Sequence, residues 1–216
     1  MPSNCVALLA VTTTTIAEFH DLPLLPHPTR GASPLRALSV SGALSASGQI
    51  TLNYQLHGEL LRLRLPEPAR NPQRRDELWR HTCLELFARR ATEVAYLEFN
   101  FSPSGDWAAY RFEGYRRGQH PFDQQPLGIT VHPLGPGQLR IQARATLPAK
   151  PRQATPGAAD PQWRLGLAAV IEASDGTVTH WATRHAGAQP DFHAPENFSL
   201  GLVPAASARQ ARAAMP

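Results

Sequence analysis

An alternation of apolar and polar residues with a period of two recurs along this chain and restricts what it can fold into. The clearest run, LRIQARATL at residues 139–147, places Leu139 and Ile141 on one side and Arg140 and Gln142 on the other. Successive side chains of a β-strand point to opposite faces of a sheet, so this pattern is typical of a strand with one buried face. We therefore expect a sheet protein.

Further alternating runs are predicted as strands joined by turns. Residues 96–101 and 107–115 flank a Ser-Pro-Ser-Gly turn, and residues 60–66, LLRLRLP, are predicted as a strand with its leucines buried on one face. The 21 prolines and 15 glycines favour short elements. Turn signals at intervals of about ten residues predict an all-β fold, an antiparallel β-sandwich of the immunoglobulin-like or jelly-roll kind with long Pro/Gly-rich loops.

The charge and the cysteine content of the chain indicate in which cellular compartment the protein acts and which kinds of partner it binds. The 216 residues carry a formal net charge of +4, but the arginines are scattered and no nucleic-acid-binding motif accompanies them. Cys5 and Cys83 make no disulfide framework and no metal-ligand spacing. The apolar run at residues 6–11 lacks a preceding basic segment and is too short to cross a bilayer. We expect a cytoplasmic protein without nucleic-acid or membrane partners, and its apolar strand faces are compatible with a homodimer.

No catalytic motif is found, so we expect a protein that is not an enzyme. The Ser-Pro-Ser-Gly turn lacks the Gly-x-Ser-x-Gly pattern of a nucleophile elbow, and no Gly-rich phosphate loop occurs. Glu85 and Glu98 fall on neighbouring predicted strands, and a glycosidase needs two carboxylates across a cleft. A sheet glutamate opposite arginines is more often a structural ion-pair residue.

A metal site is the runner-up hypothesis. Residues 180–196 hold a group of imidazole and carboxylate side chains of the kind that suits zinc: His180, His185, Asp191, His193 and Glu196. Their spacing matches no compact motif. A metal-dependent protein or enzyme would use His185, Asp191 and His193, and calcium and zinc stay open as ions.

The leading hypothesis is a non-covalent binding site built around tryptophans. Trp79, Trp107 and Trp181 lie at the ends of predicted strands beside loops, where a sandwich usually carries its ligand sites. An aromatic ring covers the C–H face of a sugar, while carboxylates, amides and guanidinium groups hydrogen-bond its hydroxyls. The candidate ligand-binding residues are Trp79, Glu98, Asn100, Trp107, Arg111, Trp181, Arg184, His185, Asp191 and His193.

The hairpin that begins at residue 96 carries three of these candidates. Its alternation predicts that Glu98 and Asn100 face the same surface of the sheet. If residues 102–105 form the turn, Glu98 lies near Ala109, with Arg111 diagonally beyond it and within reach. The pattern leaves open whether Glu98 and Arg111 belong to a ligand site or form a structural salt bridge.

Three segments carry a resemblance to a known family. LWRHTCLELF, YLEFNFSPSGDWAAYRFEGYR and HWATRHAGAQPDFHAPENFSL, in this order, resemble the DOMON-like domain proteins, which are related to the family-nine carbohydrate-binding modules. LLPHP at residues 24–28 resembles the usual start of the domain. The resemblance therefore covers roughly residues 22–203. Residues 1–21 are expected to form an N-terminal segment with an edge strand, and residues 204–216 a C-terminal tail.

The resemblance implies a sandwich that binds a sugar or, in other branches, a haem. The carbohydrate-binding relatives use paired tryptophans, which implies Trp79 and Trp181 here, with residues 184–193 closing one side. We therefore expect a non-catalytic module for a saccharide or similar hydroxyl-rich small molecule. A protein-interaction domain without a small-molecule ligand is a third class.

The cofactors of the relatives are not carried over. Haem-binding relatives use Met and His as axial ligands, but Met1 and Met215 lie at the extreme ends of this chain. A bis-His arrangement stays open among His81, His180, His185 and His193. Some relatives hold structural calcium, and this chain shows no carboxylate cluster of the density that calcium usually needs. We expect no cofactor.

Overall fold

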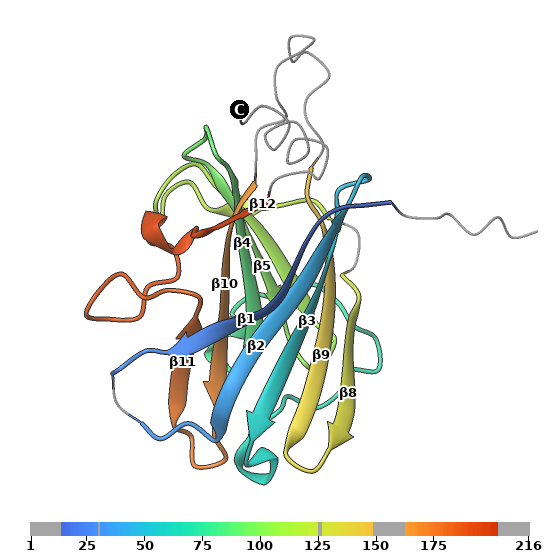
Figure 1. Cartoon of the computed structure of the whole chain (residues 1–216), viewed down its shortest axis with the longest axis vertical. Helices are drawn as coiled ribbons and strands as arrows, with labels where there is room; N and C mark the ends of the chain where they lie inside the picture. Colours follow the sequence, from blue (N-terminus) through green and yellow to red (C-terminus); the bar gives the residue numbers. More distant parts are fainter. Residues whose placement is uncertain (1–13, 30, 125–126, 149–162, 203–216) are drawn as a thin grey trace, which may run out of the picture.

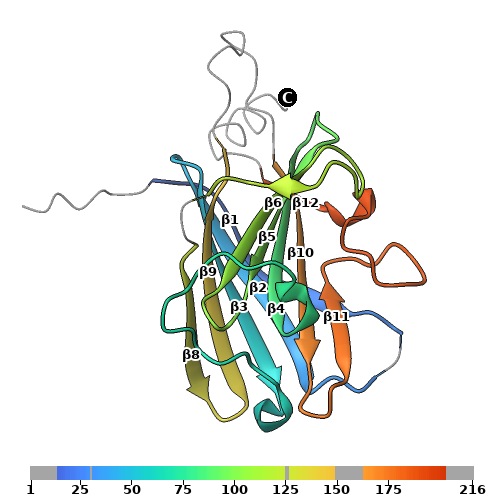
Figure 2. The same ribbon diagram turned by 180° about the vertical axis from the view of Figure 1, so that it is seen from behind.

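The computed structural model describes residues 14–29, 31–124, 127–148 and 163–202. Two antiparallel layers pack face to face (Figures 1 and 2). The first layer contains β1 (Thr15–Pro26), β2 (Leu35–Ser45), β3 (Gln49–Gly58), β9 (Gln138–Thr146) and β8 (Ile129–Gly135), in that order. The second contains β7 (His120–Pro121), β6 (Trp107–Phe112), β5 (Tyr96–Phe101), β4 (Cys83–Arg90), β10 (Trp163–Glu172) and β11 (Val178–Ala182), and β12 (Leu200–Leu202) also pairs with β10.

The two layers are the halves of one curled sheet. β1 pairs with β2 along most of its length and with β11 only at Leu25 and Pro26, and this short seam joins the layers. Three short 3-10 helices lie in the connections of the described ranges: η1 (Leu60–Arg62), η2 (Leu78–Arg80) and η3 (Pro195–Asn197). The expected all-β antiparallel sandwich is confirmed. Within the described ranges, no helix has the length and apolar character needed to cross a membrane.

The main hydrophobic core fills the space between the layers. Alternate residues of β3, among them Ile50 and Leu52, meet alternate residues of β4 and β5, such as Leu86 and Phe99. The alternation that marks these segments in the sequence thus selects the side chains that are removed from water. Burial of this apolar surface is the dominant stabilising contribution to the fold.

A second, smaller cluster covers the opposite face of β4, β5 and β6. Its buried residues include Phe87, Tyr96 and Phe112 from the strands and Phe192 and Phe198 from the connection between β11 and β12. The rings of Tyr96 and Phe112 stack with centroids 4.7 Å apart. Both faces of these strands are therefore covered, one by the first layer and the other largely by loops.

The strand expected over residues 60–66 is wrong. Residues 60–62 form η1, closed by the Arg62 N–H to the Glu59 carbonyl and the Leu63 N–H to the Leu60 carbonyl. Leu61 is fully exposed, and Leu63 makes only an isolated bridge with Ala173. The chain leaves the first layer after β3 and must cross to the second, so these residues bend where the alternation suggested an extended run.

The expected division of the chain at residues 21/22 and 203/204 stays a prediction. β1 runs across the expected boundary between residues 21 and 22, where Asp21 has a φ of 45° and the pairing with β2 shifts register. Residues 15–19 of this strand pair with β2 alone. The expected tail at residues 204–216 and the segment 1–13 lie outside the described residues.

Candidate functional site

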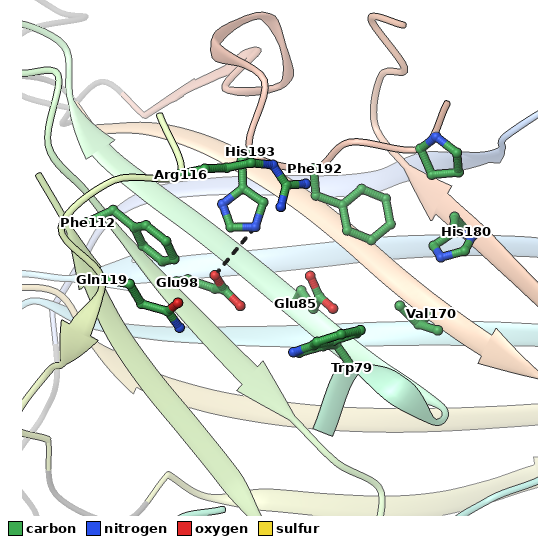
Figure 3. Close-up of a pocket in the computed structure, with 11 residues that line it drawn as sticks. Trp79, Glu85, Glu98, Phe112, Arg116, Gln119, Val170, His180, Phe192 and His193 are labelled. Carbon is green, nitrogen blue, oxygen red and sulfur yellow. Dashed lines mark ion pairs between the residues drawn. The ribbon is translucent and has the colours of Figure 1, made fainter. Parts of the chain in front are cut away.

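The outer face of the second layer is hollowed into a cavity of about 390 Å³ (Figure 3). Its base is formed by β4, β5 and β10, and its sides come from η2, the residues after β6 and the connection between β11 and β12. Its lining residues are Trp79, Glu85, Glu98, Phe112, Arg116, Gln119, Val170, His180, Pro190, Phe192 and His193.

Strand alternation and register bring two carboxyl groups to the base of this cavity. Glu85 lies between two core leucines of β4, so its side chain leaves on the opposite face, and Glu98 does the same in β5. Glu85 pairs with Asn100 across the two strands, while Glu98 pairs with Phe87. The two carboxyl groups are thus diagonal neighbours on one face of the sheet.

Glu98 is held by its neighbours on the same face. The Asn100 amide donates a hydrogen bond of 2.7 Å to Glu98 Oε1. Glu98 Oε2 lies 3.8 Å from His193 Nε2, the contact dashed in Figure 3. His193 is oriented through its other nitrogen, because Nδ1 and the Tyr96 hydroxyl lie 2.7 Å apart in a hydrogen bond.

Glu85 has a different environment. Its residue is 3% exposed, and its backbone carbonyl accepts a 3.0 Å hydrogen bond from the Tyr54 hydroxyl, which reaches across the core from the first layer. Its carboxyl group has no hydrogen-bond or ion-pair partner among the residues that the structure describes, and it faces the cavity. Its oxygen atoms are not among the fully buried atoms without a partner, so they are open to the cavity, where water or a ligand can bind them.

Burial sets the protonation of these groups. It raises the pKa of the Glu98 carboxyl to about 7, although Asn100 and the Arg116 charge act in the opposite direction. Burial, reinforced by the Glu98 charge, holds the pKa of Glu85 well above its usual range. Burial and the Arg116 charge lower the pKa of His193 to about 4. His193 is therefore neutral at pH 7, and it gains a charge only in acid, where Glu98 is already protonated, so the contact between them is not an ion pair.

The sides of the cavity are tied together through Asp191. Its carboxylate accepts hydrogen bonds of 2.6 Å from the Tyr115 hydroxyl and 2.8 Å from the Arg116 guanidinium. It also accepts the backbone N–H of His193 at 3.1 Å, and the Asn197 amide donates to the Asp191 carbonyl. Two connections that are distant in the sequence are thus joined, and His193 is fixed over Glu98.

The structure brings some of the predicted site residues together. Trp79, Glu98 and His193 line the cavity, and Trp79 is 48% exposed at its mouth. Asn100 lies beneath, bonded to Glu98, and Asp191 supports the side through Arg116.

The other two tryptophans lie elsewhere. Trp181 is 3% exposed in the core between the layers, where its Nε1 donates to Thr179 Oγ1 at 3.2 Å. Trp107 is also buried in that core. The structure does not bring Trp181 to Trp79, because β11 directs Trp181 inward while η2 carries Trp79 on the outer face.

Arg111 and Glu98 point to opposite faces, so they form neither a shared site nor a salt bridge. Glu98 pairs with Tyr110, one position further than expected, and Arg111 pairs with Leu97. The turn spans residues 102–106 and is closed by the Ser102 N–H to the Asp106 carbonyl, one residue longer than residues 102–105. A shift of one residue moves every side chain of a strand to the other face.

Arg184 and two of the histidines proposed as metal or haem ligands lie away from the cavity, whereas His180 and His193 both line it. Arg184 is exposed and does not line the cavity, and His185 Nε2 bonds the Leu25 carbonyl at 2.8 Å. His81 pairs with Glu172 at 2.8 Å, on a separate part of the second layer. Within the described ranges, no group of three or more His, Cys, Asp or Glu side chains is arranged to hold a metal ion.

Several lining residues were not among the sequence candidates. The alternation of CLELF places Glu85 on the face of Glu98, which was the available signal, although it was weighed only for a glycosidase. Arg116 and Gln119 come from an irregular connection, where no periodicity predicts the direction of a side chain. Phe112 and Phe192 are aromatic residues without a pattern that distinguishes a cavity from a core.

Comparisons with known proteins locate the fold. No protein-family model and no curated protein matches the sequence. The chain is similar to the crystal structure of a proposed carbohydrate-binding protein from Bacteroides uniformis, with 12% identity and a TM-score of 0.51 over 81% of this chain and 83% of that one. It is also matched to a family-nine carbohydrate-binding module from Caldicellulosiruptor kristjanssonii in complex with cellotriose, with 12% identity and a TM-score of 0.37 over 79% and 71% of the two chains. The first of these structures shares the fold of this chain.

Proposed function

We propose that this protein binds a saccharide, or a similar hydroxyl-rich small molecule, in the cavity on its second layer, without catalysing a reaction on it. The observation that carries the proposal is the combination, in one cavity, of buried carboxyl groups at the base and aromatic rings on the sides. The volume of about 390 Å³ falls in the range of about 300–1,000 Å³ usual for small-molecule pockets.

The lining supplies the two kinds of contact that a sugar needs. Trp79, Phe112 and Phe192 offer apolar ring surface for the C–H face of a pyranose. The carboxyl groups of Glu85 and Glu98 offer oxygen atoms to its hydroxyls, and Arg116 and Gln119 bring guanidinium and amide groups to the same space. The resemblance to DOMON-like domains and the name of the Bacteroides fold neighbour agree with this proposal.

The carboxyl pair also raises the question of glycoside hydrolysis. A hydrolase of this type places its two carboxyl groups on either side of the scissile bond. Glu85 and Glu98 stand side by side on one face of neighbouring strands. Two carboxyl groups on one side of a ligand can bind it, but they do not flank a glycosidic bond from opposite sides. The arrangement therefore favours binding over hydrolysis.

Calorimetric titration with a panel of soluble oligosaccharides tests the proposal. We expect a binding glycan to lose about tenfold in affinity with Trp79→Ala, equivalent to about 1.4 kcal/mol. The melting temperature of this variant should stay near that of the wild type, because Trp79 is half exposed. Arg111→Ala is the control, since this side chain leaves the same hairpin on the other face. If no glycan in the panel binds the wild-type protein, the proposal is wrong.

A further inference from the structure

Resting on the proposed function, we infer that the saccharide carries a protonated amine, and that its ammonium group binds between Glu85 and Glu98. The site therefore selects amino sugars over neutral sugars.

Glu85 supplies the first acceptor. Its carboxyl group faces the cavity with only 3% of the residue exposed, and no described residue donates a hydrogen bond to it. A ligand that fills the cavity removes this carboxyl group from water, which is unfavourable unless the ligand pairs with it, and more so for the ionised form. An ammonium group provides three N–H donors and a compensating positive charge, which a hydroxyl does not.

Glu98 supplies the second acceptor, next to the first. Its Oε1 already accepts from Asn100, whereas Oε2 has only His193 Nε2 nearby, at 3.8 Å. That distance is too long for a hydrogen bond. One oxygen of Glu98 and the carboxyl group of Glu85 thus lie on the same face with acceptor capacity that the described residues leave unused.

The surrounding charge favours a cation. The only guanidinium that lines the cavity, among the described residues, belongs to Arg116, and Asp191 binds it at 2.8 Å. Asp191 thus balances Arg116, and no second guanidinium among the described lining residues is available to pair with Glu85 or Glu98, whose carboxyl pKa values burial keeps high. A bound ammonium would supply the positive charge that allows these two carboxyl groups to ionise.

The sides of the cavity suit an organic cation. The aromatic rings of Trp79, Phe112 and Phe192 line it, and ring faces attract ammonium groups through their quadrupoles. A metal ion would need more ligands than this base offers, since no cluster of three or more suitable side chains is found in the described part of the chain. The lining thus combines the two features by which proteins recognise amines.

A bound ammonium should also displace protons. Burial keeps the carboxyl pKa values of both glutamates high, and a cation between them would lower both. The ionisable groups that act on Glu98 or are acted on by it come from every element around it: Cys83, Glu85, Tyr96, Tyr110, Arg116 and His193. Proton release on binding is therefore a signature that a neutral sugar would not share.

Three disaccharides with the same β-1,4 linkage test the inference, because they differ only at C2. Cellobiose has a hydroxyl there, chitobiose an amine, and N,N′-diacetylchitobiose an acetamide. We expect the wild-type protein at pH 6.5, with EDTA present, to bind chitobiose at least about tenfold more tightly than either of the others. Titrations in two buffers of different ionisation enthalpy should show proton release for chitobiose alone.

Glu85→Gln and Glu98→Gln identify the groups responsible. Each keeps the size of the side chain and removes its charge, so the preference for chitobiose should fall below about threefold, while Arg111→Ala should retain it. A neutral disaccharide that binds as tightly as chitobiose would overturn the inference and leave the proposed function standing. A preference that survives both glutamine variants would also overturn it. If none of the three disaccharides and no glycan of the wider panel binds, the proposed function fails, and the inference fails with it.

Discussion

Burial shifts the pKa values of Glu98 and His193 in opposite directions, because it disfavours the charged form of each residue. It raises the pKa of the Glu98 carboxyl to about 7 and lowers the pKa of His193 to about 4. At neutral pH His193 is thereby uncharged, and the Glu98 carboxyl is about half protonated. A cavity that keeps its own groups nearly neutral leaves charge to be introduced by the ligand.

The stability of the protein should depend on pH through these two groups. Between about pH 4.5 and 7 the folded state holds a proton on Glu98 that the unfolded state has lost, so this group lowers stability as the pH rises. His193 acts oppositely between about pH 4 and 6.5, because the folded state lacks a proton that the unfolded state binds. The two contributions offset each other below pH 6.5, and above it the free energy of unfolding should decrease.

Glu98→Gln isolates the Glu98 contribution. Between pH 6.5 and 8 it should remove about 1 kcal/mol of the decrease in the free energy of unfolding, measured by urea denaturation at each pH. Glu85 retains its carboxyl in this variant, so part of the slope should persist. A slope identical to that of the wild type would show that Glu98 has an ordinary pKa.

At the scale of elements, the connection between β11 and β12 converts a sheet face into a cavity. It is anchored by Phe198, which packs on Phe87 and Tyr96 with ring centroids 6.4 Å and 5.4 Å away. Phe192 and His193, a few residues earlier, then face the cavity. The same segment thus provides the residue that anchors it, Phe198, and the residues that line the cavity, Phe192 and His193.

Phe198→Ala should therefore weaken ligand binding from outside the cavity. Loss of the buried ring should cost about 3–5 kcal/mol of unfolding free energy and reduce glycan affinity severalfold, because Phe192 and His193 lose their support. Denaturation and calorimetry would measure the two effects. Phe19→Ala, which removes a partly buried ring packed against the main core from the first layer, is the control for a general loss of packing and should leave affinity unchanged. Equal affinity in Phe198→Ala would contradict the anchoring role.

The sequence predicts where the strands lie better than it predicts which residues of neighbouring strands pair. The alternation in residues 96–101 correctly separates Leu97 and Phe99 from Glu98 and Asn100. It does not predict the length of the turn, which has one residue more than expected and is held by a contact from outside the hairpin, since Asp106 Oδ1 accepts from the backbone N–H of Gln73. This contact comes from a distant segment, so local pattern does not reveal it.

The tryptophans show a second limit of sequence analysis. β11 alternates between half-buried and buried residues, and Trp181 points to the face opposite to that of its neighbour His180, which lines the cavity. Trp181 enters the core for this reason, and only Trp79, on a short 3-10 turn, reaches the cavity. Residues of the irregular connections, such as Arg116, depend on tertiary contacts throughout.

At the scale of the whole molecule, one hydrogen bond spans the sandwich beneath the cavity. Tyr54 of β3 is fully buried, and its hydroxyl donates to the Glu85 carbonyl of β4. The bond joins the core of the first layer to the strand that carries the cavity's unpartnered carboxyl group. The layers are therefore linked at this position by a polar contact inside an apolar core.

Tyr54→Phe should reduce the stability of the sandwich while leaving the cavity residues in place. The buried hydroxyl is lost and the bond to the Glu85 carbonyl with it, which should cost about 1–3 kcal/mol of unfolding free energy. Urea denaturation measures the cost, and glycan affinity should stay within about twofold, since Tyr54 does not line the cavity. A variant as stable as the wild type would show that the bond contributes no net stability.

The alternation along β4 and β5 has a consequence for how such a protein can diversify. Leu84 and Leu86 hold the fold, while Glu85 between them and Glu98 on the next strand meet whatever enters from outside. Substitutions at these outward positions can change the chemistry of recognition without altering the interior that keeps the chain folded. A single inserted residue within β4 would do the reverse, exchanging the two roles and losing both at once. Descendants of one ancestral sandwich can thus acquire new ligands by point substitution, while their strand lengths stay fixed.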